Sequence, residues 1–260
     1  MNLDSSITAI VTGGTSGLGA ATARRLAARG VRVAIFARNA AKADALAAEI
    51  DGLAIAVDVT RDDQVEAAFD RARSRLGQER LLVNCAGWGP SLKSVTRDRG
   101  TGAIVAHSVA RFEHVLQVNL VGTFRCLVHA AAGMMTLPPL ADGERGVIIN
   151  TSSIAAIEGQ SGQAAYSAAK AGIVGLMLPV ARDLMGDGIR VNTLLPGVFD
   201  TPMLRALPEP LLHALSQGVP FPKRLGRPDE FAALVEAVVS NTYLNGEAIR
   251  LDGALRMGTR

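Results

Sequence analysis

The feature that most constrains the fold is an alternation of short apolar runs with longer helical patterns, which continues through all 260 residues. The apolar runs predict seven strands, at residues 7–12, 32–37, 53–57, 81–84, 146–151, 190–194 and 248–251. Strands that lack polar alternation are buried on both faces, and strands that alternate with helices pair in parallel. The pattern therefore predicts an α/β protein whose parallel sheet is covered on both sides.

This arrangement is the Rossmann-type doubly wound architecture, a seven-stranded parallel sheet with helices on both faces, and its ligands bind at the carboxyl ends of the strands. No internal repeat or low-complexity linker divides the chain, so we expect residues 1–260 to form one domain. Segments 87–107 and 138–146 are rich in polar residues, glycine or proline, and we expect them to be inserted surface loops.

Composition and charge argue against several classes of protein. Hydrophobic residues make up 48% of the chain and charged residues 20%, which is typical of a globular protein rather than a disordered one. The first residues lack a basic region, and no stretch of about 18 uninterrupted apolar residues occurs, so neither a signal peptide nor a membrane partner is expected. The two cysteines, Cys85 and Cys126, predict reduced thiols and a cytoplasmic location.

Several kinds of site are also disfavoured by the sequence. The net charge is only +3 and the arginines are scattered, so no nucleic-acid partner is expected. The four histidines lack the spacing of metal ligands, so no metal is expected. The chain contains no Gly-x-Ser-x-Gly motif, which disfavours a serine hydrolase.

A glycine-rich segment, Thr12-Gly13-Gly14-Thr15-Ser16-Gly17-Leu18-Gly19, joins the first strand to the first helix. Glycines there permit a tight turn and a close approach of the backbone to a pyrophosphate, and the helix N-terminus offers free N–H groups. A plain strand–helix connection could carry similar glycines. The place of the segment after the N-terminal strand of an alternating pattern favours a dinucleotide site.

A tyrosine and a lysine share one helix face farther along the chain. Tyr166 and Lys170 are four residues apart at the start of an alanine-rich helical stretch. Tyrosine has a pKa near 10, and a nearby ammonium favours the phenolate and lowers that pKa. Ser153 follows the predicted strand at 146–151, where its hydroxyl can donate to a substrate oxygen as negative charge develops on it. Together the three side chains predict acid–base chemistry at the carboxyl edge of the sheet.

With these motifs the chain resembles the short-chain dehydrogenase/reductase family from end to end. The glycine segment resembles the family's cofactor loop, and Ser153, Tyr166 and Lys170 match its catalytic residues. Further segments that match the family are Asn84-Cys85-Ala86-Gly87, Asn119 within its Val-Asn-Leu-x-Gly stretch, and Pro196-Gly197 with Thr201. The resemblance implies a nicotinamide-dependent oxidoreductase that interconverts a secondary alcohol and a ketone.

A subgroup resemblance is more specific. Residues 158–166, 219–226, 244–247 and 250–254 are similar to the type-2 3-hydroxyacyl-CoA dehydrogenases, also known as type-10 17β-hydroxysteroid dehydrogenases. This similarity implies a homotetramer and a small-molecule hydroxy or keto substrate, either a 3-hydroxyacyl-CoA or a similar hydroxy compound. Other enzymatic interpretations are a 3-oxoacyl thioester (carrier-protein) reductase and a general ketone reductase. A dinucleotide-sensing scaffold is the non-enzyme alternative, but such proteins are expected to lack one of the three catalytic residues, all of which are present here.

The family resemblance also implies roles for individual residues. Tyr166 is implied to be the general acid/base, Lys170 to lower its pKa and hold the nicotinamide ribose, and Ser153 to polarise the carbonyl. Asn119 is expected either to hold a water in a proton relay or to cap a helix irregularity. The expected substrate contacts are Ser153, Gln160, Gln163 and Tyr166.

The expected cofactor contacts extend over the whole predicted sheet edge. Asp58 and Val59 resemble the pair that contacts adenine, and Cys85 is expected to contribute through its backbone. The full set of expected cofactor contacts is Gly13, Thr15, Ser16, Gly17, Leu18, Gly19, Arg38, Asp58, Val59, Asn84, Cys85, Ala86, Gly87, Tyr166, Lys170, Pro196, Gly197, Phe199 and Thr201.

One position departs from the NAD-linked subgroup. Ala37 stands at the end of the second predicted strand, where that subgroup has an aspartate that binds the ribose 2′-hydroxyl. An acidic residue there would repel a 2′-phosphate, whereas the neighbouring Arg38 can pair with one through two hydrogen bonds. The overall resemblance favours NAD and the local charge favours NADP, and we expect NADP.

Overall fold

The computed structural model describes residues 1–259, apart from the side chain of Met203. Its strands are β1 (Thr8–Thr12), β2 (Arg32–Ala37), β3 (Leu53–Ala56), β4 (Leu81–Asn84), β5 (Val95–Arg97), β6 (Ile104–Ala106), β7 (Gly146–Thr151), β8 (Ile189–Pro196) and β9 (Ala248–Leu251). Its α-helices are α1 (Gly17–Ala28), α2 (Ala40–Ile50), α3 (Asp62–Leu76), α4 (Val109–Leu116), α5 (Gly122–Met135), α6 (Ala164–Asp183), α7 (Pro202–Arg205), α8 (Glu209–Gly218) and α9 (Pro228–Ser240). A π-helical turn, η1 (Gln117–Val121), and three short 3₁₀ helices, η2 (Ala141–Gly143), η3 (Ile154–Ala156) and η4 (Met185–Asp187), complete the elements.

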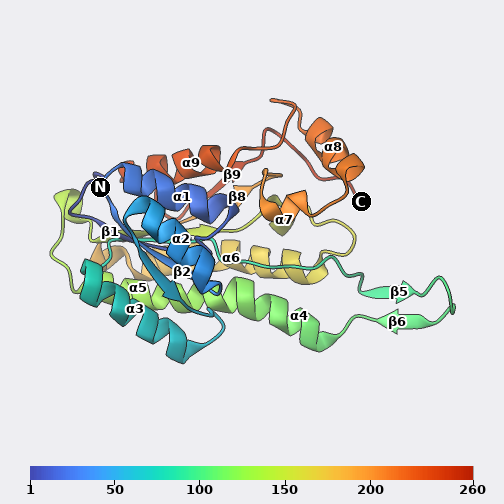
Figure 1. Ribbon diagram of the computed structural model, residues 1–260, viewed down its shortest axis with the longest axis horizontal. Helices are drawn as coiled ribbons and strands as arrows, with labels where there is room; N and C mark the ends of the chain where they lie inside the picture. Colours follow the sequence, from blue (N-terminus) through green and yellow to red (C-terminus); the bar gives the residue numbers. More distant parts are fainter. Residues whose placement is uncertain (260) are drawn as a thin grey trace.

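Seven strands form one parallel sheet in the order β3-β2-β1-β4-β7-β8-β9. Helices α1, α2 and α9 cover one face, and α3, α5 and α6 cover the other (Figure 1). The predicted doubly wound α/β fold is confirmed. The strand order reverses its direction of growth between β1 and β4, and ligands of such sheets bind outside the carboxyl ends of the strands at that point.

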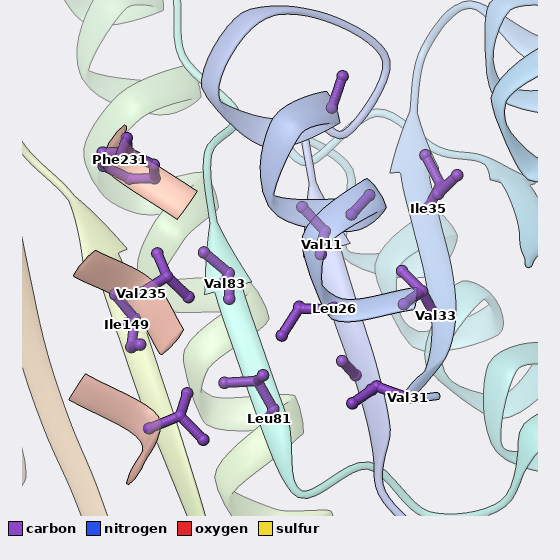
Figure 2. Packing of buried hydrophobic residues seen from close by; sticks show 14 of the residues in the cluster. Val11, Leu26, Val31, Val33, Ile35, Leu81, Val83, Ile149, Phe231 and Val235 are labelled. Carbon is purple, nitrogen blue, oxygen red and sulfur yellow. The ribbon is translucent and has the colours of Figure 1, made fainter. Parts of the chain in front are cut away.

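The two sides of the sheet bury separate apolar clusters because each strand alternates its side chains between faces. On one side, Val11, Val83 and Ile149 from adjacent strands pack against Leu26 of α1 and Phe231 of α9 (Figure 2). On the other side, a second cluster joins the sheet to α3, α5 and α6. These two clusters fix the central strands, so the loops at their carboxyl ends start from rigid positions.

The sixth sheet strand and one loop segment differ most from the sequence-based expectations. The sixth sheet strand is longer than expected, since β8 extends to Pro196 and carries that residue to the carboxyl edge. The segment 87–107 is not only loop: β5 and β6 pair as an antiparallel hairpin that projects from the body of the molecule (Figure 1). Each hairpin strand has only three residues, which is too short for the apolar alternation on which strand prediction depends, and all six residues are exposed.

Two helical stretches are long and apolar enough to cross a membrane by length and composition alone. These are Val109–Met135, with a mean hydropathy of 1.3, and Ala164–Asp183, with 1.4. The sequence expectation differed because it required an uninterrupted apolar run, whereas these stretches include a few polar and charged residues. The finding is weak evidence for a membrane span because core helices pass the same test, and both stretches supply side chains to the second cluster.

Candidate active site

The glycine-rich segment forms a compact turn at the carboxyl end of β1. Gly13 has a φ of +63°, and a Cβ there would lie 2.7 Å from the backbone N of Ala86. A Cβ on Gly19 would lie 2.5 Å from the carbonyl oxygen of Gly13. These two close approaches require glycine, because no side chain fits between the two backbones.

The N-terminus of α1 is free to receive an anion. Its N-cap residue, Ser16, makes no side-chain capping hydrogen bond, and the first turn carries no acidic residue. The unpaired N–H groups and the positive end of the helix dipole therefore face the turn without competition. The expected dinucleotide fits this cradle, and the pyrophosphate contacts expected of Gly13, Thr15, Ser16, Gly17, Leu18 and Gly19 stay a prediction.

The next wall of the site is the segment after β4. The hydroxyl of Thr12 accepts hydrogen bonds from the backbone N–H groups of Cys85, at 3.2 Å, and Ala86, at 3.1 Å. The Asn84 side chain lies beneath the edge, where its Nδ2 donates to Asn150 Oδ1 at 3.0 Å and its Oδ1 accepts from Thr12 at 3.3 Å. Asn84 thus ties the carboxyl ends of three adjacent strands together, and the backbone of Cys85 to Gly87 forms the surface above it.

Ser153, Tyr166 and Lys170 converge at the ends of β7 and α6. Ser153 follows β7 and caps η3, where its Oγ accepts from the N–H of Ala155 at 3.1 Å. Lys170 is buried and its Nζ lies 5.6 Å from the centre of the Tyr166 ring. Nζ donates to the carbonyl oxygen of Thr151 at 2.9 Å, so β7 itself fixes the lysine.

The electrostatics of this group differ from the expectation based on spacing. Burial raises the pKa of the Tyr166 phenol, and a hydrogen bond between the Ser153 and Tyr166 side chains opposes the rise. Burial also lowers the pKa of Lys170 to about 8. The expected lowering of the Tyr166 pKa by the lysine is not found in this structure, because desolvation of the phenol dominates. At neutral pH the phenol is therefore protonated and able to donate.

Asn119 lies in the π-helical turn η1, where it clamps the segment after β4. Its Nδ2 donates to the carbonyl oxygens of Trp88 and Val115, the latter at 2.9 Å, and its Oδ1 accepts from the Trp88 N–H at 3.2 Å. Both amide protons are used, so only Oδ1 retains room for a further bond on the side chain. The side chain therefore occupies a helix irregularity, one of the two expected roles. A proton-relay water at Asn119 stays a prediction.

Sequence reasoning missed Trp88 and Gly89, which follow the matched segment. A Cβ on Gly89 would lie 2.5 Å from Cδ2 of Tyr166, so this backbone packs directly on the tyrosine ring. The Trp88 ring makes an edge contact with His114 of α4, with centroids 5.4 Å apart. The only sequence signal for either residue is the position next to the Asn-x-Ala-Gly motif.

The segment after β8 closes the other side of the edge. Thr201 caps α7, and a Cβ on Gly17 would lie 3.0 Å from Thr201 Cγ2, so the glycine turn and this segment touch. Gly197 donates its N–H to Leu251 O at 3.0 Å. The Phe199 side chain turns into the first apolar cluster and meets Phe231 edge-on, so only its backbone is available for a cofactor contact.

The far end of the edge holds the residues expected near adenine and the ribose. Ala37 ends β2 as a buried residue, and Arg38 beside it is exposed. Burial raises the pKa of Asp58, but hydrogen bonds from Thr60 and the charges of Arg38 and His114 lower it further than burial raises it. Arg38 therefore lies within electrostatic range of the expected adenine pocket, and Val59 is buried beside it.

The two expected substrate glutamines are partly engaged within the protein. Gln163 Oε1 accepts from the N–H of Gln160 at 2.9 Å, and Gln160 Nε2 donates to the carbonyl oxygen of Gly258 at 3.2 Å. Gln163 Nε2 and Gln160 Oε1 form no hydrogen bond in the described part of the chain. These two atoms are the ones available to a substrate. Among residues 1–259 no group of His, Cys, Asp and Glu side chains gathers in a way that could hold a metal ion.

Comparison with known proteins identifies the family to which this site belongs. Residues 7–211 match the family described as short chain dehydrogenase. The 3-hydroxyacyl-CoA dehydrogenase type-2 of Drosophila melanogaster is 48% identical over 250 residues, which cover 95% of this chain and 96% of that relative. A 3-oxoacyl-(acyl-carrier-protein) reductase of Thermotoga maritima is 32% identical over 253 residues, covering 95% of this chain and 96% of that relative.

A solved structure agrees with these sequence matches. The crystal structure of 3-hydroxyacyl-CoA dehydrogenase type-2 from Mycobacterium avium is similar with a TM-score of 0.91 and 42% identity, covering 98% of this chain and 97% of that chain. Sequence and fold are thus shared over nearly the whole length of each protein. The chain belongs to the short-chain dehydrogenase family and is a nicotinamide-dependent oxidoreductase that acts on CH–OH groups.

Proposed function

We propose that the protein interconverts a 3-hydroxyacyl-CoA and the corresponding 3-oxoacyl-CoA. The observation that carries this proposal is the 48% identity to a relative of that name over almost the full length of both chains. A carrier-protein reductase is the second candidate, supported by the match at 32% identity. Both candidates act at the same carbon of an acyl thioester, so the chemistry proposed for the site is the same.

In this proposal Tyr166 supplies the proton and Ser153 holds the substrate oxygen. When bound, a nicotinamide would supply the hydride chemistry at the substrate carbon. In the direction of reduction, the carbonyl oxygen takes up negative charge as the hydride arrives, and the Tyr166 phenol protonates it. Burial raises the pKa of that phenol, so it is in the donating form at neutral pH. The Ser153 hydroxyl donates to the same oxygen as its charge develops.

Lys170 and Asn119 have supporting roles in the proposed mechanism. Lys170 is held against Thr151 O and is placed to bind the nicotinamide ribose as well. Asn119 fixes the backbone of Trp88, and through it the segment that packs on the Tyr166 ring. Gln160 and Gln163 are proposed to contact the acyl portion of the substrate through their free atoms.

NADP is the proposed cofactor. The carboxylate that would favour a ribose 2′-hydroxyl is missing at Ala37, and the exposed Arg38 guanidinium beside it can pair with a 2′-phosphate. The dehydrogenase relatives do not decide this question, because selectivity depends on the charge next to the 2′ position. An NADP-linked enzyme would serve mainly as a reductase, which agrees with the protonated state of Tyr166.

The remaining parts of the proposal concern assembly and location. We propose a homotetramer, because α5 and α6 expose the apolar side chains of Phe124, Val128, Met135 and Leu178 on their outer faces. We also propose that residues 1–260 act as one domain in the cytoplasm, in keeping with reduced cysteines.

Steady-state kinetics test the proposed function. Rates with acetoacetyl-CoA, a carrier-protein acetoacetyl thioester, a steroid ketone and a simple ketone are measured with NADPH and with NADH. We expect the highest kcat/KM for acetoacetyl-CoA with NADPH. A higher kcat/KM for a simple ketone would instead identify a general ketone reductase, and a higher value for the carrier-protein thioester would identify the second candidate.

A further inference from the structure

Arg250 of β9 has no role in the proposed chemistry, but its guanidinium binds two carboxylates, those of Glu158 and Asp252. Its Nη1 and Nη2 donate to the two carboxylate oxygens of Glu158, at 2.9 and 3.2 Å. Its Nε and Nη2 also donate to Oδ2 of Asp252, at 2.9 and 2.7 Å. The side chains of Arg250, Glu158 and Asp252 are only 23%, 20% and 8% exposed, so solvent screens these bonds less than it screens a surface ion pair.

Glu158 belongs to the segment of residues 157–163, which we call the substrate loop. The loop lies between Ser153 and Tyr166 and contains both glutamines proposed to contact the substrate. Glu158 also accepts from the Met257 N–H at 3.1 Å, and the Ser161 N–H donates to Thr259 O at 3.2 Å. The substrate loop is therefore held by Arg250 and by the chain after β9.

Asp252 packs behind a second segment, at the end of β8. A Cβ on Gly197 would lie 2.7 Å from the Cβ of Asp252, so the two residues are in direct contact. Gly197 is also bonded to Leu251, the residue before Asp252. The position of Asp252 thus sets the position of Pro196 and Gly197, which are the residues expected to face the nicotinamide.

We propose that Arg250 is a positioning residue that fixes the substrate loop relative to the nicotinamide-facing segment at Pro196 and Gly197. The guanidinium binds Glu158 of the substrate loop directly, and it reaches the nicotinamide-facing segment through Asp252, which packs against Gly197. The inference rests on the proposed function of the site, and it adds to that proposal a residue outside the reacting group.

Loss of the guanidinium would change the geometry because two carboxylates would then face each other. Within residues 1–259, Arg256 is the other cation bonded to both carboxylates, with Nε 3.4 Å from Glu158 Oε1 and Nη1 3.3 Å from Asp252 Oδ2, but its side chain is 62% exposed. It can compensate only in part. A lysine has no planar fork and cannot replace all of the bonds. Misplacement of reacting groups by about 1 Å can cost up to about 100-fold in rate.

The experiment compares Arg250→Ala and Arg250→Lys with a matched control, Arg73→Ala. Arg73 of α3 forms a similar fork with buried Glu79, at 3.1 and 2.8 Å, and its side chain is 24% exposed. Three quantities are measured on the full chain: cofactor affinity by calorimetry, steady-state kinetics with acetoacetyl-CoA, and hydrogen exchange of the backbone amides at residues 157–163.

For Arg250→Ala we expect kcat/KM to fall about tenfold or more, mainly through a higher KM, with cofactor affinity changed less than about twofold. Amide exchange in the substrate loop should increase, and Arg250→Lys should lie between this variant and the parent. Arg73→Ala should lower thermal stability while leaving kcat/KM and substrate-loop exchange unchanged. A general loss of stability would not lower kcat/KM and increase substrate-loop exchange in Arg250→Ala while leaving both unchanged in Arg73→Ala.

The inference is overturned if Arg250→Ala keeps the parental kcat/KM and substrate-loop exchange, or if Arg73→Ala changes both in the same way. Failure of the proposed function looks different. If the parent reduces a simple ketone but no acyl thioester, the substrate proposal fails, and Arg250→Ala is tested on that ketone. If the parent turns over no substrate, amide exchange still decides whether Arg250 holds the loop.

Discussion

The two sides of the sheet's carboxyl edge are held by different kinds of contact. On the cofactor side, the turn after β1 packs backbone against backbone, as where a Cβ on Gly13 would lie 2.7 Å from the N of Ala86. On the substrate side, side chains are fixed by hydrogen bonds, as in Lys170 to Thr151 O and Asn119 to Trp88. We therefore expect the cofactor side to be disrupted mainly by larger side chains. We expect the substrate side to be disrupted mainly by the loss of hydrogen-bonding groups.

The largest expected effect is on the substrate side. Tyr166→Phe removes the phenol proton but keeps the ring, so turnover should fall by about 10²–10⁴-fold while cofactor still binds. Steady-state rates and a cofactor titration measure the two quantities. Tyr243→Phe is the control. Tyr243 is 98% exposed, so this substitution should leave turnover and cofactor binding unchanged. Near-normal turnover in a folded Tyr166→Phe protein would remove the proposed proton donor.

On the cofactor side, adding one methyl group should be enough to disrupt the turn. Gly13→Ala places a Cβ against Ala86 at a φ of +63°, and such strain costs about 1–3 kcal/mol. We expect a lower free energy of unfolding in urea and weaker cofactor binding. Gly186→Ala is the control because a Cβ there would meet nothing within 4 Å. Equal behaviour of the two variants would mean that backbone packing does not limit this side.

A third prediction asks whether charge as well as size matters on the cofactor side. Arg38→Ala should weaken NADPH binding about tenfold, because one charge-assisted pair with the 2′-phosphate is lost, and leave NADH almost unchanged. Calorimetric titration of both cofactors into both proteins measures this. If the parent binds NADH as tightly as NADPH, Arg38 points into solvent and the NADP proposal is wrong.

The smallest effect concerns the buried ammonium on the substrate side. The pKa of Lys170 is about 8 in the folded protein, against 10.5 ordinarily, so the unfolded chain binds more protons between these values. The free energy of unfolding should therefore gain a contribution that rises with pH above about 8, by at most about 1.4 kcal/mol per pH unit. This contribution is small at pH 7 and below.

Urea unfolding from pH 7.5 to 9 isolates the contribution of Lys170. Below pH 9 the buried thiols change the free energy of unfolding little. Their pKa values are raised to about 11 for Cys85 and about 12 for Cys126, so folded and unfolded thiols differ in protonation only above the ordinary value of 9.0. The parent should gain stability over this range relative to Lys170→Met. Lys42→Met, which alters an exposed lysine, should follow the parent. Parallel curves for Lys170→Met and the parent would contradict the lowered pKa.

The same contrast explains which parts of the site could be read from the sequence. The glycines in the β1–α1 turn could be recognised in the sequence because glycine at such positions indicates a tight turn or a close approach of two backbones. The pair Tyr166 and Lys170 is visible because a spacing of four places both on one helix face. Trp88, Gly89 and Arg250 were not identified as site residues, because their partners, Asn119, Tyr166 and Glu158, are distant in sequence and only packing brings them together.

Errors in the sequence-based expectations had a related cause. The hairpin β5–β6 was expected to be loop because polar residues and glycine dominate the segment and its two strands have only three residues each. The pKa of Tyr166 was expected to be lowered by Lys170, but that argument counted charge without burial. Desolvation depends on how many neighbours surround the phenol, and a linear spacing carries no information about them.

The sequence by itself determined the doubly wound sheet and the position of the glycine turn, and it supplied the three side chains for which we propose reacting roles. These follow from periodicity and residue type, which act over a few neighbouring residues. Only the tertiary structure decided that Phe199 faces the core, that Asn119 clamps Trp88 and that Arg250 of β9 binds Glu158 in the loop before α6. Those facts depend on which distant backbones meet at the sheet edge, and that is set by the strand order and by close packing of the two apolar clusters.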